Sequence, residues 1–191
     1  GKIPQVPIFL DSPMASDATA IFHQYKNEHR LDPLVCEKVC KLPTYVKTLE
    51  ESYEIDKLDM PSVIISASGM ASGGRVLHHL KARISDYRNT IIFSGYQAGG
   101  TRGDQILSGE PEVKIYGEIV PVKAQIESIS SLSAHADYEE ILSWLSHFEV
   151  PPRKTFLTHG SPESAESLRQ KIINKLGWHC EIPHYLQREN L

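Results

Sequence analysis

The fold is decided by a stretch that the chain uses twice, first as Ser62-Val63-Ile64-Ile65-Ser66-Ala67-Ser68-Gly69-Met70-Ala71-Ser72-Gly73-Gly74. Residues 62–67 form a β-branched run that is too apolar for a strand with one wet face, which predicts a central strand of a parallel sheet. Glycine-rich residues 68–74 break this strand, and apolar residues at helical spacing then predict an amphipathic helix over 76–84. Residues 90–94, the glycine-rich loop 95–103 and a short helix or turn over 104–107 repeat the order. Strand, loop and helix in succession predict the α/β class, with a parallel sheet and covering helices.

Upstream of this stretch, residues 6–10 predict a short buried strand that stops at Asp11-Ser12-Pro13. Asp11 or Ser12 is expected to cap a helix that runs to about residue 29, because proline suits the first helical turn. Asp32-Pro33 repeats the signal and opens a shorter helix. The mixed, charged residues 41–60 predict loop with short pieces of structure.

Downstream, the character of the sequence changes. Residues 113–130 alternate apolar and polar side chains, which predicts hairpin-like antiparallel strands. Asp137 with Glu140 forms a capping-box pattern at the start of a helix. A strand over 154–158, a helix from Ser161-Pro162 to Gly177 and a last strand over 181–186 complete the order. The composition shifts near residue 131.

Composition places the chain among ordinary globular proteins. It has 191 residues, 40% of them hydrophobic and 23% charged. No apolar run is long enough to span a bilayer and the start lacks a signal-peptide pattern, so we expect no membrane partner. Three cysteines without a dense framework favour a reducing, cytoplasmic setting. The net charge of −4 argues against nonspecific coating of nucleic acid and leaves room for a local basic patch.

The two glycine-rich loops are candidate phosphate-binding sites, since each follows a strand and precedes a helix. The candidate residues are Ser68, Gly69, Gly73, Gly74, Gly95, Gly99 and Gly100. The second loop has glycines five residues apart, as in a P-loop, but Thr101-Arg102 stands where that motif needs Lys followed by Ser or Thr. A nucleotide-triphosphate enzyme is therefore disfavoured. The alternative is that these glycines only permit tight turns.

Two histidines are candidate site residues because they sit on turns between a strand-like run and a helix start. These are His135 and His159. A serine-hydrolase triad of Ser133, His135 and Asp137 is rejected, because residues so close together cannot easily build a nucleophile–base–orienter line. His78 and His79 are expected on a solvated helix face, with a positive face as the alternative.

Five blocks of the sequence resemble a known family. Ser133-Ala134-His135-Ala136-Asp137-Tyr138, followed after a helix by Leu157-Thr158-His159-Gly160-Ser161, resembles motifs B and C of the metallo-β-lactamase/β-CASP nucleases. The other blocks are Ser66-Ala67-Ser68-Gly69-Met70, Ser94-Gly95-Tyr96-Gln97 with its glycine run, and Phe9-Leu10-Asp11-Ser12-Pro13-Met14-Ala15. They stand in the family's order and cover nearly the whole chain. They are more similar to the branch of the pre-mRNA 3′-end-processing endonuclease than to that of ribonuclease J.

The resemblance implies a two-lobed enzyme that hydrolyses RNA phosphodiesters with two zinc ions between its lobes. Residues 1–131 would be the later part of a Rossmann-like, parallel-sheet β-CASP lobe. Residues 132–191 would be the C-terminal αβ elements of the metallo-β-lactamase lobe, its zinc-dependent specificity region. RNA is the implied partner, and a homodimer is compatible with the resemblance.

The same resemblance implies roles for three residues. His159, at motif C, would be a zinc ligand. His135, at motif B, would sit beside the scissile phosphate as general acid or charge stabiliser, and Ser133 would bind substrate. These roles fit metal-assisted hydrolysis, which needs Lewis acids and a donor for the leaving group.

The chain departs from the family in its metal ligands. The His-x-His-x-Asp-His signature, two further ligands and the acidic motif A residue do not occur in it, and one histidine cannot hold a zinc ion that takes three or four ligands. We therefore expect a C-terminal fragment whose partner is the missing N-terminal half, or a natural truncation. Alone it would be inactive and hold no stoichiometric zinc. The alternative is a non-catalytic RNA- or phosphate-binding or docking module, which degenerate ligands upstream would favour.

Overall fold

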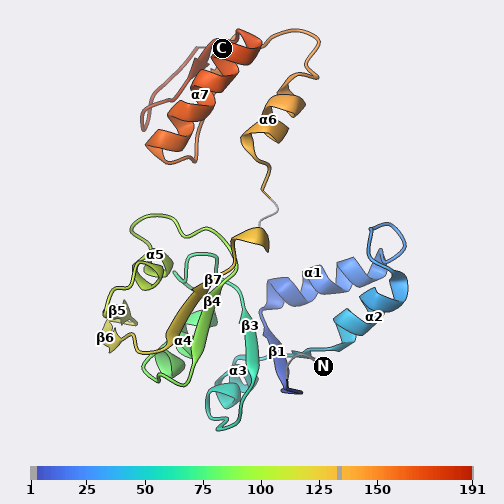
Figure 1. Ribbon diagram of the computed structural model, residues 1–191, viewed down its shortest axis with the longest axis vertical. Helices are drawn as coiled ribbons and strands as arrows, with labels where there is room; N and C mark the ends of the chain where they lie inside the picture. The colour runs from blue at the N-terminus through green and yellow to red at the C-terminus, as the bar shows by residue number, and fades with distance from the viewer. Residues whose placement is uncertain (1–3, 133–134, 191) are drawn as a thin grey trace. The chain divides into compact units, whose positions relative to one another are not determined.

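The computed structural model describes residues 4–132 and 135–190. The chain divides into two compact units, residues 1–133 and residues 134–191. The α/β class expected from the repeated strand, loop and helix is confirmed (Figure 1). None of the helices in the described parts of the chain has the length and apolar character required to cross a membrane.

A three-stranded parallel sheet opens the first unit. Strand β1 (Ile8–Asp11) lies between β2 (Thr44–Tyr45) and β3 (Val63–Ser66), and Asp11 is the register partner of Ser66. The parallel pairing of β3 is confirmed, but its predicted central position is wrong, because β1 occupies the centre. Val63 and Ile65 are accordingly 41% and 49% exposed. The apolar content of residues 62–67 therefore predicted the strand correctly, but it predicted the wrong position for it in the sheet.

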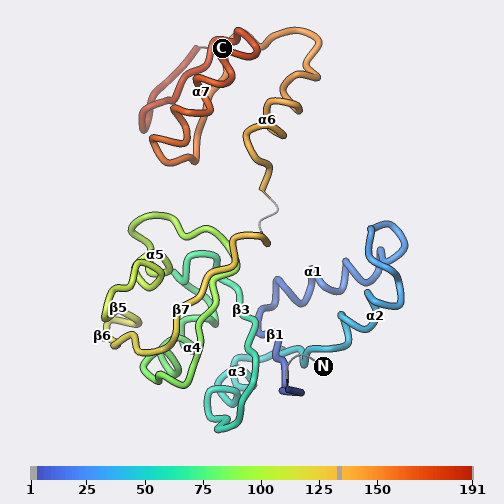
Figure 2. Tube along the Cα trace, viewed as in Figure 1, coloured from blue at the N-terminus to red at the C-terminus, as the bar shows by residue number. Residues whose placement is uncertain are grey.

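A second parallel pair joins β4 (Thr90–Phe93) to β7 (Gln125–Ser128). Between them β5 (Glu112–Ile115) and β6 (Glu118–Pro121) form the expected antiparallel hairpin, whose turn contains Gly117 at a φ of 85°. Figure 2 shows how the chain leaves this hairpin and returns beside β4. The antiparallel prediction therefore holds for the hairpin and fails for β7.

Five helices of the first unit follow capping signals to different degrees. They are α1 (Pro13–Gln24), α2 (Pro33–Lys41), α3 (Leu49–Asp56), α4 (Val76–Arg83) and α5 (Arg102–Leu107). Ser12 and Asp32 cap α1 and α2 as expected, although α1 ends before residue 29. The sequence analysis missed α3, which begins with a capping box of Thr48 and Glu51.

The core of the first unit gathers side chains from α4, α5 and the strands β4, β5 and β6. Ile84, Ile106 and Ile115 are fully buried in it. Burying an aliphatic side chain of this size is worth about 1.5–3 kcal/mol, so this cluster is a main source of the unit's stability. The glycine-rich loops 68–74 and 95–103 follow β3 and β4, and Ala71 of the first loop lies in this core.

The second unit contains α6 (Tyr138–Leu145), β8 (Thr155–Phe156), α7 (Pro162–Leu176) and β9 (Cys180–Glu181). A short 3-10 helix, η1 (Ser130–Leu132), ends the first unit. The capping box of Asp137 and Glu140 and the left-handed cap at Gly177 are confirmed, whereas the last strand is shorter than predicted. The two helices pack around Leu142, Ile172 and Trp178.

Candidate functional site

The two glycine-rich loops are bonded directly to each other. Gln97 Nε2 donates to the carbonyl oxygen of Gly69 at 2.8 Å, and the N–H of Gly103 donates to the carbonyl oxygen of Met70 at 3.0 Å. Gln97 is buried, and a Cβ at position 103 would lie 1.7 Å from its Oε1. Glycine at 103 therefore lets the second loop close on the first, and residues 68–74 and 95–103 form one surface.

Several backbone N–H groups of these loops already have acceptors. The Ser68 hydroxyl accepts from the N–H groups of Ser72 and Gly73 at 3.2 and 3.4 Å. The N–H of Gly100 donates to Asp104 Oδ2 at 2.9 Å. A phosphate would compete with a neutral hydroxyl in the first loop and with a carboxylate in the second. The first loop is thus the more accessible to an anion.

Turn geometry explains two of the candidate glycines. Gly74 and Gly100 have φ angles of 75° and 80°, in the left-handed region that favours glycine. A Cβ on Gly74 would also lie 3.2 Å from the carbonyl oxygen of Ala67. The alternative hypothesis, that these glycines only permit tight turns, explains both positions. Phosphate binding by Ser68, Gly69, Gly73, Gly95 and Gly99 stays a prediction.

In the second unit, both candidate histidines lie on turns before capped helices, as predicted. His135 is exposed and precedes α6, whose N-cap is Asp137. His159 is exposed between β8 and α7, whose N-cap is Ser161. The third candidate of this stretch, Ser133, lies outside the described residues.

His159 has a strained backbone. Its φ is 66°, a conformation that non-glycine residues adopt uncommonly and at a cost of about 1–3 kcal/mol. The next residue, Gly160, lies close to the first turn of α7, since a Cβ there would be 3.3 Å from Ala165 Cβ. Strain of this kind is common where a side chain must be presented for function, and it supports the selection of His159 as a site residue.

A buried polar cluster, which the sequence analysis missed, surrounds Asp11 at the end of β1. Asp11 is fully buried, and its Oδ1 accepts from Arg75 Nη1 at 2.6 Å. Its Oδ2 accepts from His79 Nε2 at 2.7 Å and from the hydroxyl of Ser52. Burial alone would raise the pKa of Asp11, but these hydrogen bonds outweigh it and hold the pKa below its ordinary value.

Asp56, at the end of α3, closes the cluster from the other side. Its two oxygens lie 2.6 Å from Nδ1 of His78 and 2.6 Å from Nδ1 of His79. His78 Nε2 lies 2.8 Å from the hydroxyl of Ser52, which completes a polar ring made of Asp11, Ser52, Asp56, His78 and His79. Burial would lower the pKa of His79, yet hydrogen bonds to two carboxylates raise it. Burial would likewise raise the pKa of Asp56, and its bonds to the histidines lower it.

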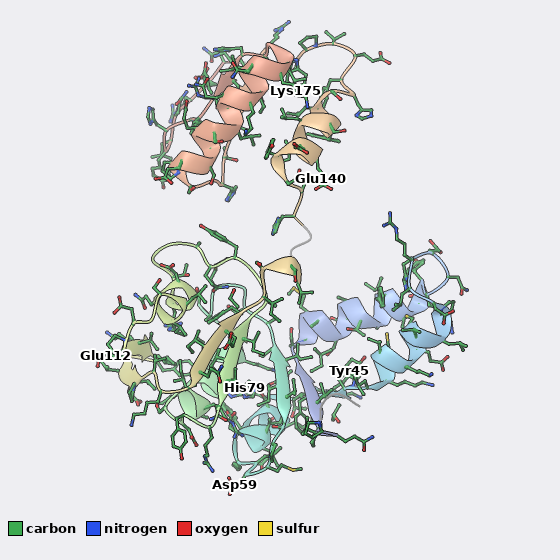
Figure 3. The ribbon with its side chains drawn as sticks, viewed as in Figure 1. Tyr45, Asp59, His79, Glu112, Glu140 and Lys175 are labelled. Atoms are coloured by element: carbon green, nitrogen blue, oxygen red, sulfur yellow. The ribbon has the colours of Figure 1, made fainter. Side chains whose placement is uncertain are left out.

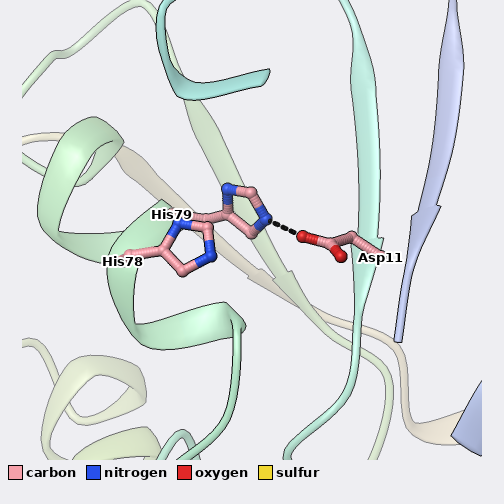
Figure 4. Close-up of side chains that lie close together, drawn as sticks. All are labelled: Asp11, His78 and His79. Carbon is pink, nitrogen blue, oxygen red and sulfur yellow. Dashed lines mark hydrogen bonds and ion pairs between the residues drawn. The ribbon is translucent and has the colours of Figure 1, made fainter. Parts of the chain in front are cut away.

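The expectation that His78 and His79 lie on a solvated helix face is wrong. They are 7% and 6% exposed, and Figure 3 places His79 within the first unit. Figure 4 shows both rings projecting from α4, with His79 bonded to Asp11. The reason is that the buried Asp11, 68 residues from His79 in sequence, and the partly buried Asp56 supply acceptors for the two rings. The neighbouring Arg75, Lys81 and Arg83 had suggested a solvated, positive face.

The polar ring also contains the one group of three metal-ligand atoms that the described residues bring together, on Asp11, His78 and His79. It does not fit a catalytic zinc site, which keeps an open coordination position. Arg75 already neutralises Asp11, and both nitrogens of His79 are engaged by carboxylates, so a metal ion would have to replace these bonds. The described residues around His159 do not gather three ligand atoms either.

Two family models match parts of this chain. Residues 1–106 match the model of the Beta-Casp domain. The chain belongs to the β-CASP family. Residues 119–183 of this β-CASP chain also match the Zn-dependent metallo-hydrolase RNA specificity domain. The resemblance of the five sequence blocks is thereby confirmed.

Three relatives illustrate the range of the family. The β-CASP chain is 35% identical to Ribonuclease TTHA0252 of Thermus thermophilus over 87% of its length, which covers 39% of that protein. It is 31% identical to Transcription termination factor FttA of Methanosarcina mazei, covering 92% of the chain and 29% of the relative. It is 32% identical to an RNase J-like protein of Methanocaldococcus jannaschii, covering 92% and 41%. The chain thus spans less than half the length of these relatives.

Proposed function

We propose that the β-CASP chain is part of a zinc-dependent ribonuclease that hydrolyses RNA phosphodiester bonds. The observation that carries the proposal is the 35% identity to a protein named as a ribonuclease, over 87% of the chain. The match of residues 119–183 to an RNA specificity domain of Zn-dependent metallo-hydrolases supports the same substrate and metal. Three free, buried cysteines are compatible with the cytoplasm as its compartment.

The proposed site residues divide the chemistry between them. His159 is the zinc ligand, and its exposed ring on a strained turn supports this role. His135 lies beside the scissile phosphate and either gives a proton to the leaving oxygen or stabilises its charge. Bound zinc ions, two in the intact enzyme, would activate water and polarise the phosphate. One imidazole cannot hold a zinc ion, so the other ligands would come from parts of the relatives that this chain does not span.

RNA would also contact the joined loops 68–74 and 95–103. A phosphate in the first loop would displace the Ser68 hydroxyl as acceptor of the N–H groups of Ser72 and Gly73. Tyr96 is 72% exposed at the start of the second loop, where its ring is available to stack on an unpaired base. A site that binds the phosphate backbone, next to an aromatic ring, is typical of surfaces that bind single-stranded nucleic acid.

A second candidate is a non-catalytic RNA-binding or docking module. It is favoured by the relatives named as transcription termination factors, a name that does not state a nuclease activity. The discriminating feature is the sequence upstream in the longer protein. Intact His-x-His-x-Asp-His ligands there favour the nuclease, and degenerate ligands favour the module.

The experiment that tests the proposal is cleavage of end-labelled RNA by the longer protein, with and without a chelator. We expect zinc-dependent cleavage that the chelator abolishes and added zinc restores. The 191-residue chain alone should bind RNA without cutting it. RNA that stays intact with a zinc-loaded longer protein would refute the ribonuclease and leave the binding module.

A further inference from the structure

Asp11 is bonded to both ends of the first glycine-rich loop. Ser66, the last residue of β3, donates its hydroxyl to the backbone carbonyl of Asp11 at 2.9 Å. Arg75, the residue directly after Gly74, donates Nη1 to the Asp11 carboxylate at 2.6 Å. The same guanidinium donates to the carbonyl oxygens of Val46 and Lys47 at 3.1 and 3.0 Å. One residue of β1 thus fixes the points where the loop begins and ends.

Asp11 itself is held in one position. Its carboxylate is fully buried and accepts from Arg75, His79 and Ser52, which come from the start of α4, from within α4 and from α3. Asp56 holds the far nitrogen of His79 at 2.6 Å. A buried carboxylate with charge-assisted bonds in several directions has little freedom to reorient. The anchor of the first loop is therefore rigid.

The first loop in turn sets the second. The carbonyl oxygens of Gly69 and Met70 accept from Gln97 and Gly103 of loop 95–103. A shift of the first loop would break these bonds and leave Gln97 buried with fewer partners. Contacts therefore connect β1 to loop 68–74, and loop 68–74 to loop 95–103.

We propose that Asp11 is a positioning residue that fixes the shape of both glycine-rich loops through Ser66 and Arg75. The loops then present one preformed surface to the phosphate backbone of RNA, a step that rests on the proposed function. Asp11 touches neither the exposed loop surface nor a reacting group, so it acts only through the residues that it holds. Preformed surfaces bind more tightly because ordering costs are met before the ligand arrives.

The polar ring offers a matched control for this role. Asp56 also bonds His79, but its hydrogen bonds to the described residues are with the two histidines and not with the ends of the loop. Asp11→Asn and Asp56→Asn each remove one carboxylate charge opposite the buried His79, from a fully buried residue in the first case and a partly buried one in the second. Both should lower the melting temperature of the 191-residue chain, by about 10 °C, because each leaves a buried charge without its partner.

The test is amide hydrogen exchange of the 191-residue chain at a temperature where all variants are folded. We expect Asp11→Asn to speed exchange at least tenfold in residues 68–74 and 95–103, and Asp56→Asn to leave these loops near the wild-type rate. If Asp11→Asn does not fold, Arg75→Ala is the alternative variant. It removes the side chain that fixes the end of loop 68–74 and leaves the polar ring in place. It should also speed exchange in the loops, and Arg75→Lys, which keeps the charge, should partly restore protection.

Equal exchange of the loops in the Asp11 and Asp56 variants would overturn the positioning role, as would wild-type loop protection in Arg75→Ala. Stoichiometric zinc in the wild-type chain that is lost in both carboxylate variants would also overturn it, because the ring would then be a metal site. Affinity for a 5′-phosphorylated oligoribonucleotide separates this inference from the proposed function. Loosened loops with unchanged affinity would refute RNA binding at the loops and leave the positioning role standing.

Discussion

His78 and His79 of the first unit are buried and bonded to carboxylates or a hydroxyl, whereas His135 and His159 of the second unit are exposed on turns before helices. The first pair belongs to the polar ring that holds the Asp11 carboxylate in place. The second pair is exposed within its own unit, and His159 has a strained backbone. A histidine's neighbours in space, more than its neighbours in sequence, decide between these uses.

The largest expected effect concerns His159 in the longer protein. His159→Ala should lower zinc content and reduce cleavage more than the 10–100-fold that loss of an outer-shell partner of a metal typically costs. Metal analysis and a cleavage assay measure the two effects. The control is His184→Ala, which removes another exposed imidazole of the same unit. Full zinc occupancy in His159→Ala would defeat the ligand assignment.

His135 should separate catalysis from metal binding. In the longer protein, His135→Ala should retain zinc and slow cleavage by about 10²–10⁴-fold, the usual contribution of a positioned proton donor. Single-turnover cleavage with parallel metal analysis gives the result. A variant that cleaves at the wild-type rate removes His135 from the site, and one that also loses zinc would make it a ligand.

His79 and the two carboxylates bonded to it should make the stability of the first unit depend on pH. The pKa of His79 is raised by its bonds to Asp11 and Asp56, so the charged ring stabilises the fold fully below about pH 6.5. This contribution is lost as the pH rises through the folded-state pKa. The two carboxylates have lowered pKa values, so their contribution is present above about pH 4 and is lost on acidification. The first unit should therefore be most stable between these limits.

His79→Gln tests this window. We expect it to cost about 3–5 kcal/mol, as for a broken buried ion pair, and to flatten the loss of stability as the pH rises above about 6.5. Melting followed by circular dichroism measures the change. Both tryptophans, Trp144 and Trp178, lie in the second unit, so their fluorescence is an internal control that should not respond. An unchanged pH slope in His79→Gln would exclude His79 as the titrating group.

Local signals in the sequence predicted the elements better than their arrangement. Capping patterns at Ser12, Asp32 and Asp137 marked helix starts correctly, because a cap and its helix are adjacent in the chain. The position of β3 at the end of its sheet depends on strands that pair across the fold, which apolar content does not encode. The capping box of Thr48 and Glu51 at the start of α3 is also a local signal, and it stands within the mixed, charged residues 41–60 that predicted mainly loop.

In the candidate site too, features set by nearby residues could be predicted, and contacts across the fold could not. The turn positions of His135 and His159 could be predicted, because each depends on a strand-like run and a helix start nearby. The polar ring could not, since its residues come from β1, α3 and α4 and carry no common spacing. The bond between His79 and Asp11 joins residues 68 positions apart. Only the fold turns such residues into partners.

The smallest expected effect is that of Gly103→Ala. It tests whether the contact between the two loops contributes to stability, as the polar ring does. Gly103→Ala places a Cβ 1.7 Å from Gln97 Oε1, so the Gln97 side chain must shift, and we expect this shift to weaken its bond to Gly69. We expect a loss of about 1–3 kcal/mol in the free energy of unfolding, measured by urea denaturation. Gly95→Ala is the matched control, because no atom lies within 4 Å of its added Cβ and its φ is not positive. If both variants lose the same stability, the two loops are not joined through Gln97. A selective loss in Gly103→Ala would show that the loop surface is built into the fold before any ligand binds.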